Sequence, residues 1–572
     1  MQLRHALVTV VILSVACASG GPPTARTPAS SAPMAMAGPG ASFAWPAADT
    51  ATALHLLNRL TFGARPGDIE RVQRLGIGRW LDQQLAPARI PDTVDAAVRR
   101  QYALAFESPA ELYRQFPPAQ QVAALTARRT DGQTDMMGDS SRPSGRQAVR
   151  PSPAGPPPAR ILGGQIVLAT LTRHALSDRQ LQEVMTDFWF NHFNVFIGKQ
   201  ANRWTTSDYV ERAIRPNALG SFQALLEAVA HHPAMLTYLD NAQSVAPGSQ
   251  PPGFARRFAA QLPDQVRRQM PTGLNENYAR ELLELHTLGV DGGYTQADVQ
   301  NVARILSGWS IRGPGGGRLQ GRGGELFSWE FHPWAHDRGE KTVLGETFPA
   351  GHMKDEGERL LAMLALHPST ARHLAHKLCA RFVSDESPDG CVDHAVSAYL
   401  RSHGNIAATI RAIVGSEDFW APVNRRAKVK SPLEFVISAM RATGAVPDSS
   451  PRLAGVLQQL GQPLFQQPVP TGYPETQEDW VNSGALLNRM NIAMGLAAGR
   501  LPGAVVDLDA VVPLVTDRDE LVARVNAAIL GGQASANTLR VLRRQIDDLT
   551  DPRTARTMAV GLALGSPEFQ RQ

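Results

Sequence analysis

The chain has 572 residues, 43% of them hydrophobic and 19% charged, which is enough apolar material for a large core. Its net charge of +5 is small for this length, and only six of the 57 basic residues are lysines. No motif of a nucleic-acid-binding fold accompanies the arginines, so we expect no nucleic-acid partner.

The first 18 residues have the layout of an export signal. An apolar run from Ala6 to Ala16 is too short to span a bilayer, and Ala16-Cys17-Ala18 matches the A-x-A pattern of signal cleavage. Cys17 also allows a lipoprotein signal and a lipid anchor, although Ser14 stands where an aliphatic residue is usual; a buried N-terminal helix is the third interpretation. We expect an exported protein, either periplasmic, in the cell envelope or secreted, with residues 19–50 as a flexible tether.

From residue 51 to residue 572 the hydrophobic residues recur mainly with the period of a helix, which predicts a single large, mostly α domain with Gly/Pro-rich loops. Polar residues, proline and glycine dominate residues 130–160, so we expect a disordered insertion there, and a second loop insertion at about 245–273. The alternating stretches "LFSWEF" and "KTVLG" predict at most a small β-hairpin near 325–346.

Residues 275–309 predict a helix, a tight turn and a second helix. Gly289 follows the last helical turn, where a left-handed cap needs glycine, and Asp291-Gly292-Gly293 makes the reversal. Thr295 is expected to cap the next helix, with Asp298 three residues later as in a capping box.

Asn277, Glu281 and Glu284 fall within about 60° of one another on the first of these helices, at about 100° per residue. One interpretation is a solvated face on which Arg280 pairs with Glu284. The other is an interior cleft in which the two carboxylates hold a divalent metal ion or act as acid and base, with Asn277 binding substrate. His286 lies opposite, on the apolar side.

Two further segments supply candidate partners for these carboxylates. In "DFWFNHFNVF", His192 is either a core histidine or a metal ligand and acid/base residue, and Trp189 and Asn191 are candidate substrate-binding residues. In the loop "HDRGEK", His336 and Asp337 are candidate catalytic residues beside Lys341, a candidate substrate-binding residue; alternatively, Asp337 only caps a turn ahead of Gly339.

Trp480 and Asn482, near the Pro-rich segment "GQPLFQQPVPTGYPETQ", form a polar and aromatic set that suits a carbohydrate or peptide, or else packs against that segment. Cys379 and Cys391 flank a Pro-Asp-Gly turn, which predicts a disulfide in an oxidising compartment. Three cysteines at these positions cannot build a zinc site by themselves.

Six blocks of the sequence, in order, resemble the bacterial family known as domain of unknown function 1800. They are "FWFNHFNVF", "NENYARELLELHTLGVDGGYTQADVQNVARILSGW", "HDRGEKTVLG", "HPSTARHLAHKLCARFVSD", "KVKSPLEFVISAMRA" and "GQPLFQQPVPTGYPETQEDWVNSGALLNRMN". The resemblance implies an exported, mostly helical protein and no established activity. It also implies a partner, the exported family domain of unknown function 1501, which resembles sulfatases and phosphatases. One position departs from the family pattern Trp-His-Asn-His-Phe, since Phe190 replaces its first histidine.

Two functions follow as hypotheses. The first is an exported hydrolytic enzyme, dependent on a metal or on acid/base groups, in which Glu281, Glu284, His192, His336 and Asp337 converge. The second is a non-catalytic envelope protein that binds or helps assemble a partner similar to domain of unknown function 1501. The sequence contains no H-E-x-x-H motif, no G-x-S-x-G elbow and no Walker loop, so it does not indicate a familiar catalytic class.

Overall fold

The computed structural model describes residues 43–118, 158–250, 273–313 and 325–572, and residues 45–572 form one compact unit. The predicted signal at 1–18, most of the tether and most of the two predicted insertions lie outside the described residues. Within the described part, no helix is both long and apolar enough to cross a membrane. The prediction of a mostly α protein is confirmed.

Two groups of helices form the first half of the unit. The first group is α1 (Thr50–Leu60), α2 (Asp68–Leu75), α3 (Ile77–Leu85), η1 (Pro87–Arg89), α4 (Thr93–Gln101), η2 (Ala103–Phe106) and α5 (Pro109–Gln115). The second is α7 (Pro158–Leu176), α8 (Gln180–His192), α9 (Asn202–Asp208), η3 (Tyr209–Ile214), η4 (Arg215–Asn217), α10 (Phe222–Ala230), α11 (Pro233–Tyr238), η5 (Asn241–Gln243), α14 (Glu276–Glu281), η6 (Leu282–Thr287) and α15 (Gln296–Ile305).

The second half continues with two more groups. The first is α16 (Asp355–Ala365), α17 (Pro368–Phe382), α18 (Asp389–Arg401), α19 (Ile406–Val414), α20 (Glu417–Trp420), η8 (Pro422–Asn424), α21 (Pro432–Ala442) and α22 (Arg452–Gln459). The last is α23 (Gln477–Trp480), α24 (Ser483–Ala497), η9 (Leu508–Ala510), α25 (Arg518–Leu530), α26 (Ala536–Ile546), α27 (Pro552–Leu564) and α28 (Pro567–Gln570).

The strands form three small antiparallel pairs in the described residues. Strand β1 (Trp309–Ile311) pairs with β2 (Trp329–Phe331), β3 (Lys341–Val343) with β4 (Glu346–Phe348), and β5 (Val446–Pro447) with β6 (Ala504–Val505). The small amount of sheet near 325–346 is therefore confirmed, but its pairing differs from the expected one. The segment "LFSWEF" pairs with β1, the strand that follows α15, and "KTV" makes its own hairpin with the residues after it.

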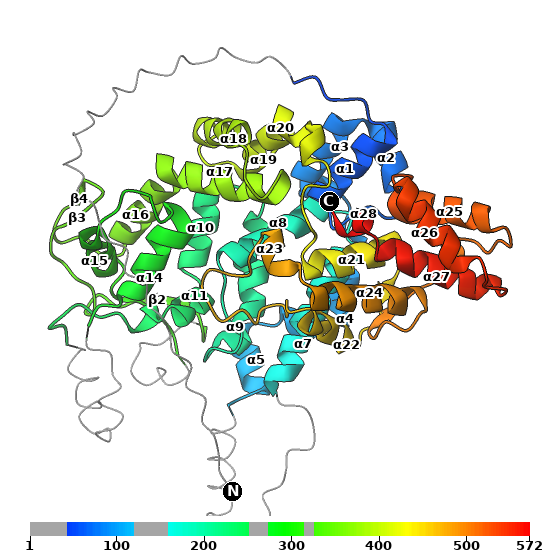
Figure 1. Cartoon of the computed structure of the whole chain (residues 1–572). Coiled ribbons are helices and arrows are strands. Elements are labelled where there is room, and N and C mark those ends of the chain that lie inside the picture. The colour runs from blue at the N-terminus through cyan, green and yellow to red at the C-terminus, as the bar shows by residue number, and fades with distance from the viewer. Residues whose placement is uncertain (1–42, 119–157, 251–272, 314–324) are drawn as a thin grey trace, which may run out of the picture. The chain divides into compact units, whose positions relative to one another are not determined.

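Helix α8 lies near the centre of the unit (Figure 1), where it contacts α1, α3, α7, η3 and η4. Nearly every α8 side chain is buried, including Val184, Phe188 and Trp189. Helices α25, α26 and α27 pack together at one end, whereas α14, α15 and α16 lie at the other (Figure 1). Because α8 is covered on more than one side, its polar side chains must find partners inside the protein.

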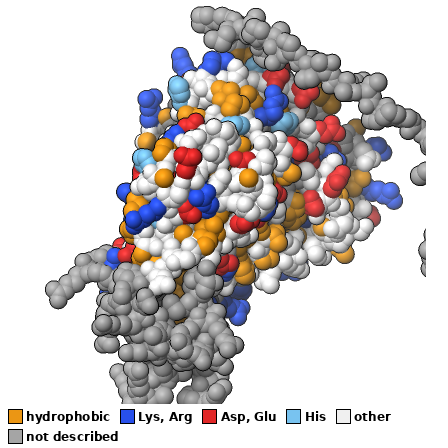
Figure 2. Space-filling model, turned by 90° about the vertical axis from the view of Figure 1, so that its left-hand side faces the viewer, with side chains coloured by type: hydrophobic (Ala, Val, Ile, Leu, Met, Phe, Trp, Pro, Cys, Tyr) orange, Lys and Arg blue, Asp and Glu red, His pale blue; other side chains and the backbone are white. Residues whose placement is uncertain are grey.

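The surface shows mixed charge. On the face drawn in Figure 2, basic and acidic side chains alternate with apolar ones, and no single patch of lysine and arginine dominates. An arrangement of both signs keeps a protein soluble without creating a strong field of one sign.

The turn between α14 and α15 forms as predicted, but the helix before it ends differently. Gly289 has a φ of 85°, and Thr295 and Asp298 form a complete capping box at the start of α15. The residues before Gly289 form the π-helix η6, in which the amide of Leu288 donates to the carbonyl of Leu283, five residues back. Such short π segments occur frequently at functional sites.

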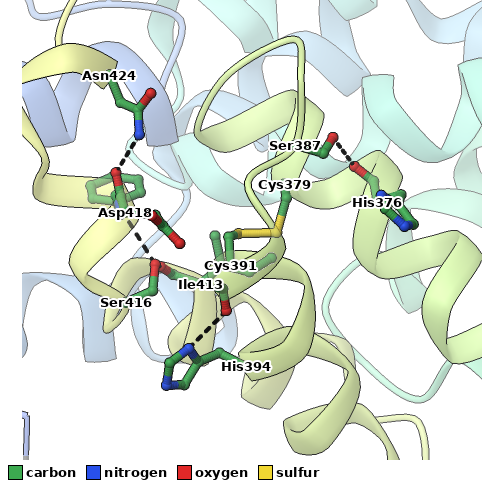
Figure 3. Close-up of a disulfide and its surroundings, with 11 residues drawn as sticks. His376, Cys379, Ser387, Cys391, His394, Ile413, Ser416, Asp418 and Asn424 are labelled. Atoms are coloured by element: carbon green, nitrogen blue, oxygen red, sulfur yellow. Dashed lines mark hydrogen bonds between the residues drawn. A yellow bond between two sulfur atoms is a disulfide. The ribbon is translucent and has the colours of Figure 1, made fainter.

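The predicted disulfide is confirmed. Cys379 of α17 and Cys391 of α18 are bonded, their Cα atoms 6.1 Å apart, and both side chains are fully buried (Figure 3). The Ser387 hydroxyl, in the loop between them, donates to the carbonyl of His376 at 2.9 Å. The disulfide therefore closes a short loop that is also held by hydrogen bonds.

Replacing both cysteines, as in Cys379→Ser/Cys391→Ser, is expected to lower the free energy of unfolding by about 2–4 kcal/mol, because the cross-link restricts the unfolded chain. Denaturant unfolding with and without a reducing agent measures the effect. Wild-type protein in reductant should approach the double variant, while the variant itself should not respond to reductant. Equal stability of the oxidised wild type and the variant would contradict the prediction.

Candidate functional site

The π-helix η6 turns His286 toward His192 at the end of α8. The two rings have centroids 6.2 Å apart, and a third ring, that of His373 on α17, lies 6.1 Å from His192. The Lys377 ammonium, one turn further along α17, is 3.1 Å from Nδ1 of His192. We call His192, His286, His373 and Lys377 the histidine–lysine cluster.

Hydrogen bonding fixes the tautomer of His192. The Lys377 ammonium has only donors, so Nδ1 of His192 accepts, and Nε2–H donates to the carbonyl of His286 at 3.1 Å. Burial and the charge of Lys377 hold the pKa of His192 well below its usual value, and the same two causes lower that of His286 to about 3. With both ring nitrogens occupied, neutral His192 has none left for a metal ion or a substrate.

A cavity with a volume of about 70 Å³ lies against another side of α8. Its wall combines α8 and α7 with α17, the start of α21 and the Pro-rich segment before α23. We call it the α8 cavity; the polar residues that line it are Thr170, His174, Thr186, Asp187, Asn191, Asn194, Arg381, Lys428, Ser431, Glu434, Gln462, Tyr473, Glu475 and Trp480.

Asp187 is the acid that α8 itself contributes to the cavity. Burial raises the pKa of Asp187 to about 7, opposed by the charge of Arg381 and reinforced by the carboxylates of Glu434 and Glu475. A carboxyl group with this pKa carries a proton on about half of the molecules at neutral pH. It can therefore donate a proton under conditions where an ordinary aspartate cannot.

Glu475 reaches the cavity from the Pro-rich segment, which Asn191 fastens to α8. The Asn191 amide donates to the carbonyl of Tyr473 at 2.8 Å and accepts from the Tyr473 amide at 2.6 Å. Gly472 has a φ of 75°, and a Cβ there would lie 2.4 Å from the carbonyl oxygen of Asn191, so only glycine permits this approach. Oxygen Oε2 of Glu475 is buried, and no described residue hydrogen-bonds to it.

Ion pairs hold the other charged groups of the cavity. Arg381 pairs with Glu434, which also closes the capping box of α21 with Ser431. Burial opposes ionisation of Glu434, but Arg381 outweighs it and lowers the pKa of Glu434 to about 2. Lys428 pairs with Asp385, which lies in the loop closed by the disulfide. These pairs leave Asp187 and Glu475 as the carboxylates in the cavity wall without a salt bridge among the described residues.

The structure divides the residues proposed from the sequence among several places. Asn191 and Trp480 line the α8 cavity, while His192 belongs to the histidine–lysine cluster behind it. Trp189 is fully buried and donates to the carbonyl of Ala218 at 2.9 Å, which is a packing role. Asn482 caps α24 through the amide of Ala485. The structure therefore does not bring all the candidates together in the α8 cavity.

Glu281 and Glu284 lie beside Tyr294 and outside the α8 cavity. Both are partly buried, and the Tyr294 hydroxyl donates to Glu284 at 3.3 Å. Arg280 contacts Glu276 at 3.9 Å, so the predicted pair with Glu284 does not form. Burial, with the nearby charge of Glu284, raises the pKa of Glu281. Asn277 is exposed at the start of the same helix.

His336, Asp337 and Lys341 form a third, separate group. Nδ1 of His336 is 2.9 Å from the carbonyl of Ser307, and the Lys341 ammonium donates to Glu356 at 2.7 Å. The Asp337 carboxylate pairs with Arg304 through both oxygens and accepts from the amide of Gly339 at 2.9 Å. The capping interpretation of Asp337 is thus supported by geometry, and the group anchors the loop onto α15.

No three His, Cys, Asp or Glu side chains are grouped so as to hold a metal ion in the part of the chain that the structure describes. Of the proposed ligands of a divalent metal, Glu281 and Glu284 adjoin Tyr294, whereas His192 contacts His286 and Lys377. Reasoning from sequence missed Asp187, Glu434, Glu475 and Arg381. A signal existed for one of them, because Asp187 directly precedes the aromatic run "FWF" and lies four residues before Asn191, hence on the same face.

The model of a protein family described as "protein of unknown function (DUF1800)" matches residues 55–571 of the chain. The chain belongs to this family. The match covers the histidine–lysine cluster, the α8 cavity and the disulfide, so the whole site lies within the family's extent. No curated protein and no solved structure matches the chain significantly.

Because the pKa of Asp187 rises from 3.8 to about 7 on folding, the native state holds more protons than the unfolded state between those pH values. The free energy of unfolding should therefore fall as pH rises through this window, by up to about 1.4 kcal/mol per pH unit. Asp187→Asn removes this loss, so the variant should be more stable than wild type at pH 8 and similar at pH 4. Thermal melts at pH 4, 6 and 8 measure the difference.

Asp548→Asn, at an exposed position of the same residue type, is the control and should follow wild type at every pH. A difference in melting temperature between wild type and Asp187→Asn that does not depend on pH would contradict the raised pKa of Asp187.

The histidine–lysine cluster and the Glu281/Glu284 stripe should respond differently to mutation. His192→Leu leaves the Lys377 ammonium without its acceptor, at a cost of about 1–3 kcal/mol in the free energy of unfolding. Glu281→Gln/Glu284→Gln breaks no ion pair among the described residues and should change the free energy of unfolding by less than about 0.5 kcal/mol. Denaturant unfolding of both variants at pH 7 compares them, and a larger loss in the glutamate variant would refute this division of roles.

Proposed function

We propose that this protein is an exported hydrolase that uses acid/base catalysis, with Asp187 and Glu475 of the α8 cavity as its catalytic residues. The observation that carries the proposal is the pair itself. Two carboxyl groups without salt bridges share one cavity, and their surroundings differ. Two such groups in different environments are a common basis for dividing acid and base roles.

Asp187 is assigned as the general acid. Its pKa of about 7 matches the pH at which a proton donor is most effective, because the group is both protonated and able to release its proton. In hydrolysis, the proton of Asp187 would pass to the leaving group of the substrate as the scissile bond breaks. The negative charges of Glu434 and Glu475 help to keep that proton in place until then.

Glu475 is assigned as the general base. Its Oε2 has no hydrogen-bond partner in the described part of the chain, so we assign it to accept the proton of an attacking water molecule. Water then supplies its hydroxyl to the substrate while Glu475 gains one proton and Asp187 loses one. Proton transfer between the two groups and solvent restores the starting state. The charge of Glu475 acts on Arg381 and Lys377, where it raises the pKa of each and favours their charged forms.

The scaffold around the pair is suited to catalysis because it is preorganised. Asn191 clamps the segment that carries Glu475, and Phe465 of the same wall adopts a φ of 63°, a conformation that bulky residues rarely take. The disulfide and the N-terminal signal pattern support export, since disulfides persist in oxidising compartments.

Hydrolysis by the purified full chain tests the proposal with a panel of chromogenic glycosides, esters, phosphate esters and peptide amides. Wild type should turn over at least one class, and Asp187→Asn and Glu475→Gln should each lower kcat by about 10²–10⁴-fold. The profile of kcat/KM against pH should fall above about pH 7 in wild type, where Asp187 loses its proton.

Glu478→Gln is the matched control, because Glu478 is exposed on the neighbouring helix α23 and does not line the cavity. Turnover that persists unchanged in both cavity variants would place the chemistry elsewhere. Absence of turnover across the panel, together with a partner that binds the native protein, would favour the non-catalytic role instead.

A further inference from the structure

The wall of the α8 cavity contains a carboxylate, Glu475, that can attract a positively charged group. Arg381 is occupied by Glu434, and Lys428 by Asp385. The Lys377 ammonium acts on Glu475 from a distance but donates to His192. Oxygen Oε2 of Glu475 is thus a buried acceptor that no donor reaches within the described residues. A buried carboxylate oxygen of this kind is costly unless a ligand or water satisfies it.

Aromatic rings form much of the rest of the wall. Phe190 and Phe465 meet edge to face at 4.8 Å, and Tyr473 and Trp480 lie 6.3 Å apart. The Tyr473 hydroxyl donates to the carbonyl of Pro463 and the Trp480 indole to that of Pro474, so their polar tips are already satisfied. What these residues offer a ligand is their ring surface, whose negative face attracts cations.

His174 provides a second and independent sign of a ligand. This residue lines the cavity, is only 1% exposed, and neither of its ring nitrogens has a hydrogen-bond partner among the residues that the structure describes. Burial and the charge of Arg173 lower the pKa of His174 to about 3, so the ring is neutral and presents one donor and one acceptor. A hydroxyl or an amide can satisfy either of them.

We propose that the substrate of the α8 cavity carries a protonated amine, attracted by the negative charge of Glu475 and by the aromatic ring faces, close to a hydroxyl or amide that His174 binds. This rests on the proposed function in that it concerns the same cavity. A volume of about 70 Å³ has room for about five water molecules at roughly 10–15 Å³ each, so it admits one small ring or side chain. The amine-bearing unit is therefore the end or a single residue of the substrate.

Three sugars of nearly the same shape distinguish an effect of ligand charge on binding from an effect of ligand shape. Glucosamine carries an ammonium group on a sugar ring, N-acetylglucosamine replaces it by a neutral amide, and glucose has a hydroxyl there. Titration calorimetry with Asp187→Asn, the full chain without its catalytic acid, measures binding in the absence of turnover. Glucosamine should bind at least tenfold more tightly than either neutral sugar, and added salt should weaken its binding.

Two variants in the Asp187→Asn background test the assignment of the binding groups. Glu475→Gln should abolish the preference for glucosamine, and Trp480→Leu should weaken glucosamine at least threefold. Glu478→Gln should leave both unchanged, and melting curves confirm that each variant is folded. Equal affinity for the three sugars, no binding of glucosamine, or a preference that survives Glu475→Gln overturns the inference.

The outcome is distinct from that of the hydrolysis test. Turnover that depends on Asp187 and Glu475 but shows no preference for amines retains the proposed function and rejects the substrate class. Selective binding of glucosamine without any turnover retains the ligand and rejects the hydrolase.

Discussion

Arg381 and Glu434 meet in the interior of the protein, where either charge alone would be very costly to bury. Glu434 is the third residue of α21 and closes its capping box, so the same side chain that pairs with Arg381 also fixes the start of the helix. Gln572 donates to Glu434 as well, at 2.9 Å. Removal of one partner would leave an uncompensated buried charge, which typically costs about 3–5 kcal/mol.

The other parts of the cavity depend on this pair and on two further links. Asp385 lies in the loop after α17, and its carboxylate pairs with Lys428 and accepts from the amide of Gln477, the first residue of α23. The Pro-rich segment is therefore held at one end by Asp385 and nearer its middle by Asn191. The disulfide ties the end of α17 to α18, which restrains the loop that contains Asp385. A cavity assembled from segments so far apart in sequence exists only when the whole unit is folded.

Local features of the fold could be read from sequence because local chemistry determines them. Gly289 ends its helical segment, Thr295 starts the next helix, and the two cysteines flank a turn; each follows from residues a few positions apart. The π-helix before Gly289 was not predicted, since its apolar residues fit an ordinary helical period. Strand pairing was wrong for a similar reason: "LFSWEF" and "KTVLG" both alternate correctly, and alternation does not specify a partner.

The site was only partly predictable because it forms where segments far apart in the sequence meet. Asn191 and Trp480 were proposed from their surroundings in the sequence, and both line the cavity. His192 lies one residue beyond Asn191, which rotates it by about 100° and places it in a different cluster. Glu475 and Arg381 gave no signal, because a single acid in a Pro-rich segment and a single arginine on a helix are ordinary features. Their importance comes from what the fold places beside them.

Helix α8 separates the histidine–lysine cluster from the α8 cavity, and the ionisable groups on its two sides differ in charge. On one side, the histidine–lysine cluster is neutral except for Lys377, since burial lowers the pKa values of its three histidines. On the other, Asp187 holds its proton up to about pH 7. Lys377 connects the two, because it donates to His192 and acts on Glu475. A change at His192 thus reaches the cavity through the position of one ammonium group, although His192 itself does not line it. His192 stands out in the sequence, but in the structure it supports Asp187 and Glu475, which do not stand out in the sequence.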